Sequence, residues 1–577
     1  MPATRIITID ELRDEFNFLG DWEEQCKFLI EVGEELPDLS ADEMSEENRV
    51  YGCQSRVWVT HSVRDDAGQP RVEFRAKSDA RIVDGLIVVL LALFNGKTPD
   101  EILAADFRSA FSDLGLESHL VPQRRNGLYS MVERMRSIAR ELAPGDCAAV
   151  AAAPASITLP TDEDARPRRR MFDVDDVRQD FPALQQTLSG GHPVTYLDSA
   201  SSAQKPQVVI DKECEVYEQY YANAYRGVYK FGDRVSTELE RAREKVQRFI
   251  GARGTDEVIF TSGATMSINL VAQAWGRKFL QPGDEVLLTQ LEHHANLVPW
   301  QFIAQQTGAV VKYVPLTDDG RLDQDAFTQL LSSRTKMFAV TGMSNVLGTV
   351  PPIREMVRKA KEAGVLTLVD GAQSVPHIPV NVAADQIDFF AFSGHKVYGP
   401  SGVGVLYGRR ELLAEMDPFL CGGHMIEQVT LTGSTYAKAP AKFEAGTPPI
   451  AQAIALGTAL DYLSELTLCP IHKHEQTLLR HAHELLSEVP GLKIYGPAPS
   501  EKGAIVSFTV ENAAAGDLAQ LLDLKGVFVR HGHHCTMPLH EHLQVPATVR
   551  ASFGLYNTLD DVERLVEGLR FALGELT

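Results

Sequence analysis

Short apolar runs alternate with longer segments of helical periodicity through the second part of the chain. Runs that are apolar throughout predict strands buried on both faces, and helices between successive strands predict a mostly parallel sheet covered on both sides. The predicted strands are residues 257–260, 285–288, 310–314, 337–340 and 367–369. From about residue 440 the pattern changes to long helices with fewer strands, which predicts a smaller C-terminal α/β subdomain.

The first 142 residues follow a different pattern, in which an alternating strand, a Gly-Pro-containing turn and a return strand predict a hairpin. Thr98 and Pro99 are typical of a helix start, as cap and first-turn residue. The predicted elements are strands 57–63 and 71–76 and helices 21–36, 80–94, 126–142 and one beginning near residue 98. Together they predict a small α+β domain.

Between the two parts, residues 143–170 are rich in alanine with scattered proline and show no apolar period. This composition predicts a flexible tether. Its end carries four arginines beside three acids, which is more typical of a solvated linker than of a nucleic-acid patch. The predicted organisation is therefore domain 1–142, linker 143–170 and domain 171–577.

The composition narrows the class of protein. Of 577 residues, 44% are hydrophobic and 23% charged, as in soluble globular proteins, and the net charge of −22 argues against binding to nucleic acid or to an anionic membrane surface. The longest apolar run, 86–94, is too short to span a bilayer. Seven scattered cysteines argue against a disulfide framework, and the N-terminus has no signal-peptide core, so we expect a cytoplasmic protein.

Lys396 lies in a glycine- and proline-rich loop that directly follows the apolar run 388–390. A lysine at the end of a buried strand is a candidate Schiff-base nucleophile, because desolvation favours its neutral, reactive amine. An ordinary surface lysine in a turn is the alternative from this loop alone.

Asp370 ends another apolar strand, 367–369, and its spacing from Lys396 allows one connection and one more strand between them. Both groups would then emerge at the same edge of the sheet, where open α/β folds bind ligands. An aspartate there can pair with the protonated pyridine nitrogen of pyridoxal 5'-phosphate and keep the ring cationic.

Two further loops follow predicted strands. The Gly-containing loop 261–265 precedes a helix, where free amides and the helix dipole can hold a phosphate. His293, in Glu-His-His-Ala-Asn, offers a flat ring that can stack on a pyridine, although a lone histidine is more often a surface or internally bonded residue.

Cys535 follows two histidines in Arg-His-Gly-His-His-Cys, residues 530–535. Neighbouring protonated histidines would favour its reactive thiolate. A zinc site is the competing interpretation, since this segment is rich in possible ligands. These ligands are His531, His533, His534, Cys535, His540 and His542.

Cys53 lies beside a glycine just before the first predicted strand, which places it at a loop tip. A buried structural thiol is the commoner fate of a free cysteine, and we assign that role to the five cysteines other than Cys53 and Cys535.

These motifs resemble two families. Residues 391–400, 367–373 and 530–535 are similar to the fold-type I pyridoxal-phosphate enzymes and, within them, to the Suf-type (group II) cysteine desulfurases of the class V aminotransferases. Gly-Cys-Gln-Ser-Arg-Val-Trp, residues 52–58, resembles the SufE-like sulfur acceptors, and this second resemblance covers about residues 8–142.

The resemblance implies roles for individual residues. Lys396, Cys535, Cys53 and His293 would be catalytic, Arg550 and Asn345 would bind the substrate, and Thr447 would reach the phosphate of a neighbouring subunit in a homodimer. The implied cofactor-binding residues are Lys396, Asp370, Gln373, His293, Ala264, Thr265, Asn345, Ser393, His395 and Thr447. No metal is implied.

The resemblance implies a cysteine desulfurase fused to its own acceptor. L-Cysteine would become L-alanine, leaving a persulfide on Cys535 that passes to Cys53 and then to iron–sulfur scaffold proteins. A selenocysteine lyase of the same fold, a non-enzymatic metal-binding scaffold, and a first domain that only activates the second remain as alternatives.

Overall fold

The computed structural model describes residues 7–20, 22–50, 56–66, 69–116, 122–142, 170–188, 191–225 and 227–576. The chain divides into two compact units, Met1–Thr161 with Tyr225–Asp233 and Asp162–Ala224 with Arg234–Thr577. The predicted linker lies almost entirely outside the described residues, so the boundaries 1–142, 143–170 and 171–577 stay a prediction.

The first unit contains a three-stranded antiparallel sheet of β1 (Arg49–Val50), β2 (Val57–Asp66) and β3 (Gln69–Ser78). The predicted hairpin is confirmed, but its strands pair from Val57↔Ser78 to Asp66↔Gln69 and so run closer to the turn than the alternation suggested. Buried apolar residues of β2 and β3 belong to one core with the helices.

The described helices of this unit are α1 (Ile9–Leu19), α2 (Trp22–Glu34), α3 (Arg81–Phe94), α4 (Pro99–Ala104), α5 (Phe107–Asp113) and α7 (Pro122–Leu142). The predicted cap at Thr98 is confirmed, because its side chain accepts a hydrogen bond from the Glu101 amide at 3.3 Å. Helices α2 and α3 cross at Gly85, where a Cβ would lie 2.3 Å from the Leu29 carbonyl oxygen. Glycine is therefore required for this close packing.

The second unit is built on a seven-stranded sheet in the order β5-β11-β10-β9-β8-β6-β7. The strands are β5 (Val258–Thr261), β6 (Glu285–Thr289), β7 (Val310–Val314), β8 (Thr335–Thr341), β9 (Leu366–Asp370), β10 (Phe389–Ser393) and β11 (Gly404–Gly408). Only β11 runs against its neighbours, so the prediction of a mostly parallel sheet is confirmed.

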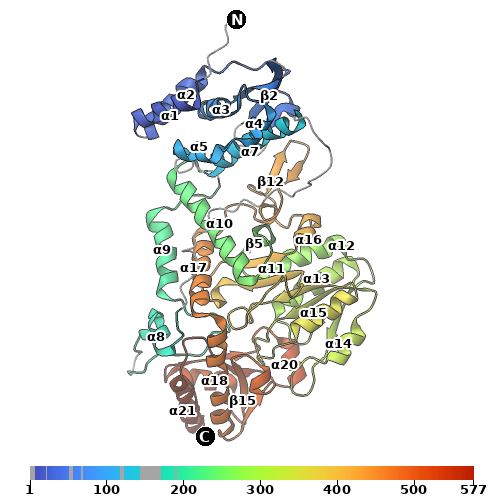
Figure 1. Ribbon diagram of the computed structural model, residues 1–577. Helices are drawn as coiled ribbons and strands as arrows, with labels where there is room; N and C mark the ends of the chain where they lie inside the picture. The colour runs from blue at the N-terminus through green and yellow to red at the C-terminus, as the bar shows by residue number, and fades with distance from the viewer. Residues whose placement is uncertain are drawn as a thin grey trace. The chain divides into compact units, whose positions relative to one another are not determined.

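Helices pack on this sheet, among them α11 (Ala264–Val271), α13 (Val298–Thr307), α14 (Gln324–Leu330) and α15 (Ile353–Glu362) (Figure 1). Apart from β7 at the sheet edge, the strands are almost entirely buried, and only Lys336 of β8 and Leu366 of β9 are partly exposed. Their near-continuous apolar sequence follows from this double-sided cover.

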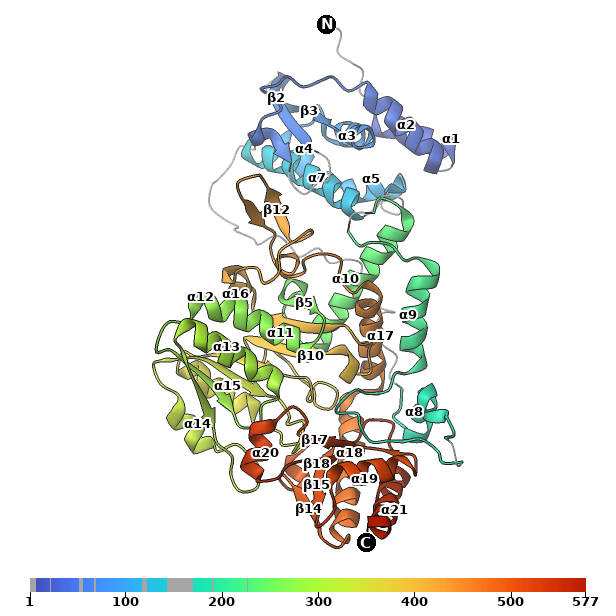
Figure 2. The same cartoon turned by 180° about the vertical axis from the view of Figure 1, so that it is seen from behind.

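The predicted smaller C-terminal subdomain is also present. A four-stranded antiparallel sheet, β14-β15-β18-β17, packs against α18 (Leu468–Ser487) and α19 (Ala515–Asp523), and α21 (Leu559–Leu576) packs against these two helices (Figure 2). The strands are β14 (Leu492–Tyr495), β15 (Ile505–Val510), β17 (Arg530–Gly532) and β18 (Thr548–Ser552). A separate apolar core joins these elements.

No single described helix is long and apolar enough to cross a membrane. Taken together, α17 (Ile450–Leu466) and α18 have the length and the apolar composition of a membrane span, but a bend of 78° separates the two helices.

Candidate active site

A cavity of about 550 Å³ lies within the second unit, where β6, β8, β9 and β10 end. It is lined by every predicted site residue except Cys53 and Thr447. Its walls are formed by Ala200, Ser201, Ser202, Ala264, Thr265, His293, Ala295, Thr341, Asn345, Asp370, Ala372, Gln373, Ser393, His395, Lys396, Ser401, Arg530, His534, Cys535 and Arg550. Parallel strands bring the lining segments between residues 264 and 401 to one edge of the sheet, and the C-terminal subdomain adds Arg530, His534, Cys535 and Arg550.

Lys396 ends a short 3₁₀ turn, Gly394–Lys396, directly after β10, as predicted. Burial lowers the pKa of its amine to about 8, against the attraction of Asp370, while Arg550 lowers it further. A lysine with this pKa has a much larger neutral fraction near pH 7 than a solvated one, so it is suited to nucleophilic and proton-transfer chemistry.

Asp370 is the last residue of β9 and is almost fully buried. Its Oδ1 accepts a hydrogen bond from the Ala372 amide at 3.0 Å. Burial raises its pKa, whereas this hydrogen bond and Lys396 act to lower it. A cationic group in the cavity would therefore find a desolvated carboxylate partner here.

His293 begins the turn after β6, and its Nδ1 accepts a hydrogen bond from the Ala295 amide at 3.0 Å. This contact assigns the ring proton to Nε2. Burial lowers the pKa of His293 to about 3, and the nearby Lys396 charge adds to the effect. The residue therefore presents a neutral, flat imidazole, which is the form that stacks on an aromatic ring without adding charge.

The first turn of α11 carries Ala264 and Thr265, and the Ala264 amide donates to the Ser393 hydroxyl at 2.8 Å. This bond joins the helix start to the end of β10. The other amides of this turn point toward the helix N-terminus, where a phosphate is stabilised. Burial lowers the pKa of His395 to about 4, so this neighbour is neutral as well.

Arg550, on β18, is buried and binds both sides of the cavity. Its Nη1 donates to the Asn345 carbonyl at 2.9 Å, and its Nη2 donates to Ser201 Oγ at 2.7 Å and Asp198 at 3.1 Å. Its Nε is buried with no partner among the described residues. A buried, unsatisfied guanidinium N–H fits an incoming carboxylate.

Two charged residues near this arginine were not predicted. Arg530 also lines the cavity, and its Nη2 and Nε donate to Asp198 at 2.8 and 3.1 Å. Asp198 thus holds two arginines in place. Arg530 belongs to the same six-residue motif as Cys535, so this motif could have predicted it. No motif in the sequence pointed to Asp198.

Another unpredicted residue, Glu292, is fully buried beside His293. Its carboxyl group accepts hydrogen bonds from the Thr341 amide at 3.0 Å and from Asn296 Nδ2 at 2.6 Å. Burial raises its pKa to about 8. Glu292 is therefore protonated near neutral pH and ties the end of β6 to the end of β8.

Cys535 stands on the loop between β17 and α20 (Met537–Leu543) and is exposed. His534 and Cys535 both have positive φ, 50° and 58°, which L-residues adopt at a free-energy cost. The loop is held by hydrogen bonds from the His294 amide to the Cys535 carbonyl at 2.8 Å and from the Met537 amide to His294 Nε2 at 3.0 Å. Asn345 Nδ2 adds a third, to the His534 carbonyl at 2.8 Å.

The expectation of protonated histidines around this thiol is wrong for His534. Burial, with a contribution from Arg550, lowers the pKa of His534 to about 2, so its ring is neutral. In the described part of the chain, no three His, Cys, Asp or Glu side chains converge so that they could hold a metal ion.

Other cysteines and Thr447 lie elsewhere. Cys214, Cys421 and Cys469 are exposed, so the assignment of a buried structural role to them is wrong. Thr447 is exposed and does not line the cavity. Cys53 lies outside the described residues.

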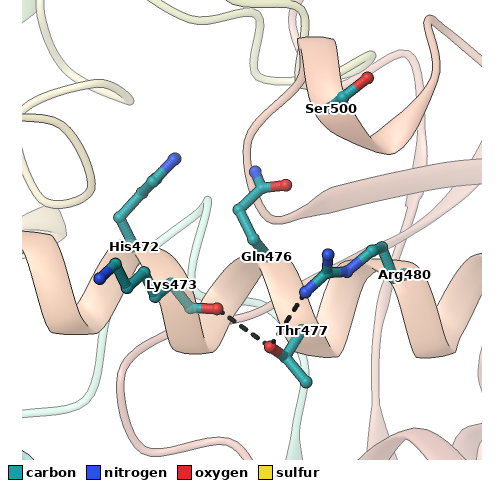
Figure 3. Close-up of a pocket in the computed structure, with 6 residues that line it drawn as sticks. All are labelled: His472, Lys473, Gln476, Thr477, Arg480 and Ser500. Atoms are coloured by element: carbon teal, nitrogen blue, oxygen red, sulfur yellow. Dashed lines mark hydrogen bonds between the residues drawn. The ribbon is translucent and has the colours of Figure 1, made fainter.

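A second pocket, of about 450 Å³, lies over α18 and is lined by His472, Lys473, Gln476, Thr477, Arg480 and Ser500 (Figure 3). Thr477 donates to the Lys473 carbonyl at 3.1 Å and accepts from Arg480 at 3.4 Å. None of the residues lining it carries a carboxylate or a thiol, so it has no counterpart of Asp370 or Cys535 in the first cavity.

The first cavity fits pyridoxal 5'-phosphate on three observations. A helix N-terminus can receive the phosphate, a buried carboxylate can receive the ring nitrogen, and a desolvated lysine can receive the aldehyde. Gln373 is also at the wall, buried and anchored through Nε2 to the Ala200 carbonyl at 2.6 Å.

Comparison with known proteins agrees with this geometry. Residues 195–565 match the aminotransferase class-V family and residues 10–139 match the Fe-S metabolism associated domain family, SufE. A cysteine desulfurase of Serratia proteamaculans is 49% identical over 400 residues, covering 69% of this chain and 98% of the relative. One of Pectobacterium atrosepticum is 48% identical over the same length.

Solved structures give the same picture for the second unit. A cysteine desulfurase of Escherichia coli is 39% identical with a TM-score of 0.66, covering 71% of this chain and 100% of that one. The apo cysteine desulfurase of Thermococcus onnurineus is 36% identical with a TM-score of 0.67, covering 70% and 100%. The chain therefore belongs to the pyridoxal-phosphate-dependent class-V aminotransferase family and carries an N-terminal domain of the SufE family.

Proposed function

We propose that the chain is a cysteine desulfurase that converts L-cysteine to L-alanine and passes the sulfur to its own SufE-family domain. One observation carries this proposal: Lys396, Asp370, Arg550 and Cys535 line a single cavity. A lysine–aspartate pair suits pyridoxal phosphate, a buried arginine suits an amino-acid carboxylate, and a thiol at the same wall suits attack on a sulfur atom.

When bound, pyridoxal phosphate supplies an electrophilic aldehyde and a ring that accepts electrons. Lys396 would hold the aldehyde, Asp370 the ring nitrogen and His293 the ring face. The first turn of α11, with Ser393 and His395, would hold the phosphate.

The chain's own residues divide the remaining work. Arg550 binds the carboxylate of the substrate and so orients it. This contact fixes the position of the substrate α-carbon relative to Lys396. Lys396 Nζ, with its lowered pKa, takes the α-proton and returns a proton later in the cycle. Neutral His293 adds no competing charge beside the developing negative charge.

Cys535 attacks the substrate sulfur and keeps it as a persulfide. A sulfur held in this way moves to a second thiol by thiol–disulfide-type exchange. Cys53 is the proposed receiving thiol, because it stands in the SufE-like motif of the matched domain.

Further parts of the proposal concern the setting of this reaction. We place the protein in the cytoplasm, as a homodimer in which Thr447 of one subunit serves the phosphate of the other. Iron–sulfur scaffold proteins would be the final acceptors. A SufE-family domain on the same chain supports such a sulfur route.

The experiment is to supply purified, cofactor-loaded protein with L-cysteine or L-selenocysteine and a thiol reductant, and to measure alanine. Alanine and sulfide in equal amounts from L-cysteine are expected. Alanine from selenocysteine alone would replace the proposal by a selenocysteine lyase. Stoichiometric zinc with no visible absorption from the cofactor would favour the metal-binding scaffold.

A further inference from the structure

A chain of buried polar groups runs from the Cys535 loop into the C-terminal subdomain. Thr548 Oγ1, on β18, lies 3.0 Å from His534 Nε2 and 3.2 Å from His540 Nε2. His540, on α20, and Thr548 are almost completely buried, and His534 is only 8% exposed. One hydroxyl therefore connects two imidazole rings away from bulk water.

The direction of each hydrogen bond can be assigned. His540 Nδ1 lies 3.1 Å from the Thr536 carbonyl oxygen, which can only accept, so this nitrogen carries a proton. Burial lowers the pKa of His540, which makes the ring neutral and leaves Nε2 as an acceptor. Thr548 therefore donates to His540 and accepts from His534 Nε2–H.

This assignment leaves His534 Nδ1 as a bare acceptor. The atom is buried and has no hydrogen-bond partner among the described residues. Leaving a buried polar atom without a hydrogen bond destabilises the folded protein, so its retention calls for an explanation. His534 lines the cavity and precedes Cys535, the thiol that must lose a proton before it attacks.

We propose that His534, Thr548 and His540 form a proton relay that receives the thiol proton of Cys535. The relay rests on the proposed desulfurase function. The thiol proton moves to His534 Nδ1, the Nε2 proton of His534 moves to Thr548, and the Thr548 proton moves to His540 Nε2. Cys535 must turn toward His534, since the two groups are not hydrogen-bonded in the structure.

The relay explains how His534 can assist the deprotonation of Cys535 although its own pKa is so low. Arg550 and Arg530 face His534 and oppose a positive charge on it, as does His540. In the relay His534 only changes tautomer, and the charge appears on His540. The titratable groups facing His540 are His533, whose ring centroid lies 5.5 Å away, and His534.

The atoms and electrons balance over the cycle. The thiolate pair of Cys535 forms the S–S bond, and the pair of the breaking C–S bond stays with the substrate carbon. The methyl group of alanine contains one more hydrogen than the methylene group of cysteine. This equals the one proton that Cys535 gives up, so the relay is restored without another reactant.

The test compares two substitutions of one residue. Thr548→Val keeps the shape and removes the hydroxyl, whereas Thr548→Ser keeps the hydroxyl. Alkylation of Cys535 by iodoacetamide, measured by mass spectrometry between pH 5 and 9 without L-cysteine, reports thiolate formation. Single-turnover persulfide formation with L-cysteine reports the chemistry, and both use the full cofactor-loaded chain.

We expect Thr548→Val to shift the alkylation profile to higher pH and to slow persulfide formation by roughly 10²-fold, the range of general acid–base assistance. Thr548→Ser should recover most of both rates. Thr195→Val is the matched control, because Thr195 is fully buried, its hydroxyl has no hydrogen-bond partner in the described part of the chain, and it lies outside the cavity. This control should match the wild type.

His540→Gln gives a second, independent variant. Its amide oxygen still accepts from Thr548 but cannot take up a proton, so we expect it to be as slow as Thr548→Val. Each of three results would overturn the relay. Thr548→Val could be as fast as the wild type, Thr548→Ser could be as slow as Thr548→Val, or His540→Gln could be fully active. Because alkylation needs no substrate, a wild type that forms no persulfide would instead refute the proposed function.

Discussion

Among the residues that line the cavity, Asp370, Ser393 and Lys396 stand at or directly after the ends of buried parallel strands, whereas Cys535 stands on an exposed loop with left-handed backbone. The sheet fixes the first group through its own hydrogen bonds. The loop is held instead by separate hydrogen bonds to His294, Asn345 and Thr548.

This difference suits the two tasks. Groups that hold a cofactor need one fixed geometry throughout the cycle. A thiol that collects sulfur and then hands it to another thiol must reach two places, and a loop with few anchors allows this movement. The same cavity therefore combines a rigid wall at the strand ends and a movable wall at the Cys535 loop. Substitutions in these two walls should have different consequences.

Substitution on the rigid side should have the largest effect. Lys396→Ala should abolish alanine production, because both the link to the cofactor aldehyde and the proton-transferring amine are lost. Borohydride reduction followed by peptide mapping should find no cofactor attached to the chain. A covalent link that persists in this variant would mean that another lysine holds the cofactor.

On the loop side, Cys535→Ser should release almost no sulfide while cofactor and L-cysteine still bind, because the thiol is needed only to take up sulfur. Spectral titration with L-cysteine and a sulfide assay separate the two properties. Sulfide release at the wild-type rate would remove the persulfide role and favour the metal-binding interpretation of the histidines.

A smaller effect is expected when one anchor of the loop is removed. Asn345→Ala leaves the buried His534 carbonyl without its donor, and such a loss costs about 1–3 kcal/mol. We expect faster alkylation of Cys535, measured without substrate, and slower turnover. Gln301→Ala is a matched control, since the side chain of Gln301, as far as the structure describes the chain, forms a hydrogen bond only with the exposed Tyr313 hydroxyl. Unchanged alkylation in Asn345→Ala would show that this anchor does not restrain the loop.

The smallest effect is a pH dependence of the loop. Burial and His533 lower the pKa of His294 in the folded protein. Folded His294 therefore stays neutral and accepts a hydrogen bond from the Met537 amide. In the unfolded chain, by contrast, the same histidine takes up a proton below about pH 6.5. The stabilisation by this contact is therefore full above pH 6.5 and decreases as the pH falls toward the lowered pKa. The protection factor of the Met537 amide against hydrogen exchange, which is corrected for the pH dependence of intrinsic exchange, should be lower at pH 5.5 than at pH 7.5, and His294→Ala should remove this difference.

The rigid wall was the part of the site that could be predicted from the sequence. Asp370 and Lys396 follow apolar runs whose period indicates buried strands, and parallel topology then brings them to one edge. The prediction of α11 was two residues late, because Ala264 and Thr265 already belong to its first turn.

The loop side depends on contacts across the sequence that no local pattern contains. Asp198 meets Arg530 and Arg550 more than 330 positions away, and Thr548 meets His534 only after two strands and a helix are in place. The neutral state of His534 also follows from burial among arginines, whereas the sequence alone suggested protonated histidines.

The central claim is that sulfur leaves the cavity through Cys535 and arrives on Cys53. The most direct test is to incubate the full-length protein with L-cysteine, trap persulfides by alkylation and map them by mass spectrometry in the wild type, Cys535→Ser and Cys53→Ser. The account predicts persulfides on both cysteines in the wild type, on neither in Cys535→Ser, and on Cys535 alone in Cys53→Ser. A persulfide on Cys53 in the Cys535→Ser protein, or none on Cys53 in the wild type, would contradict it.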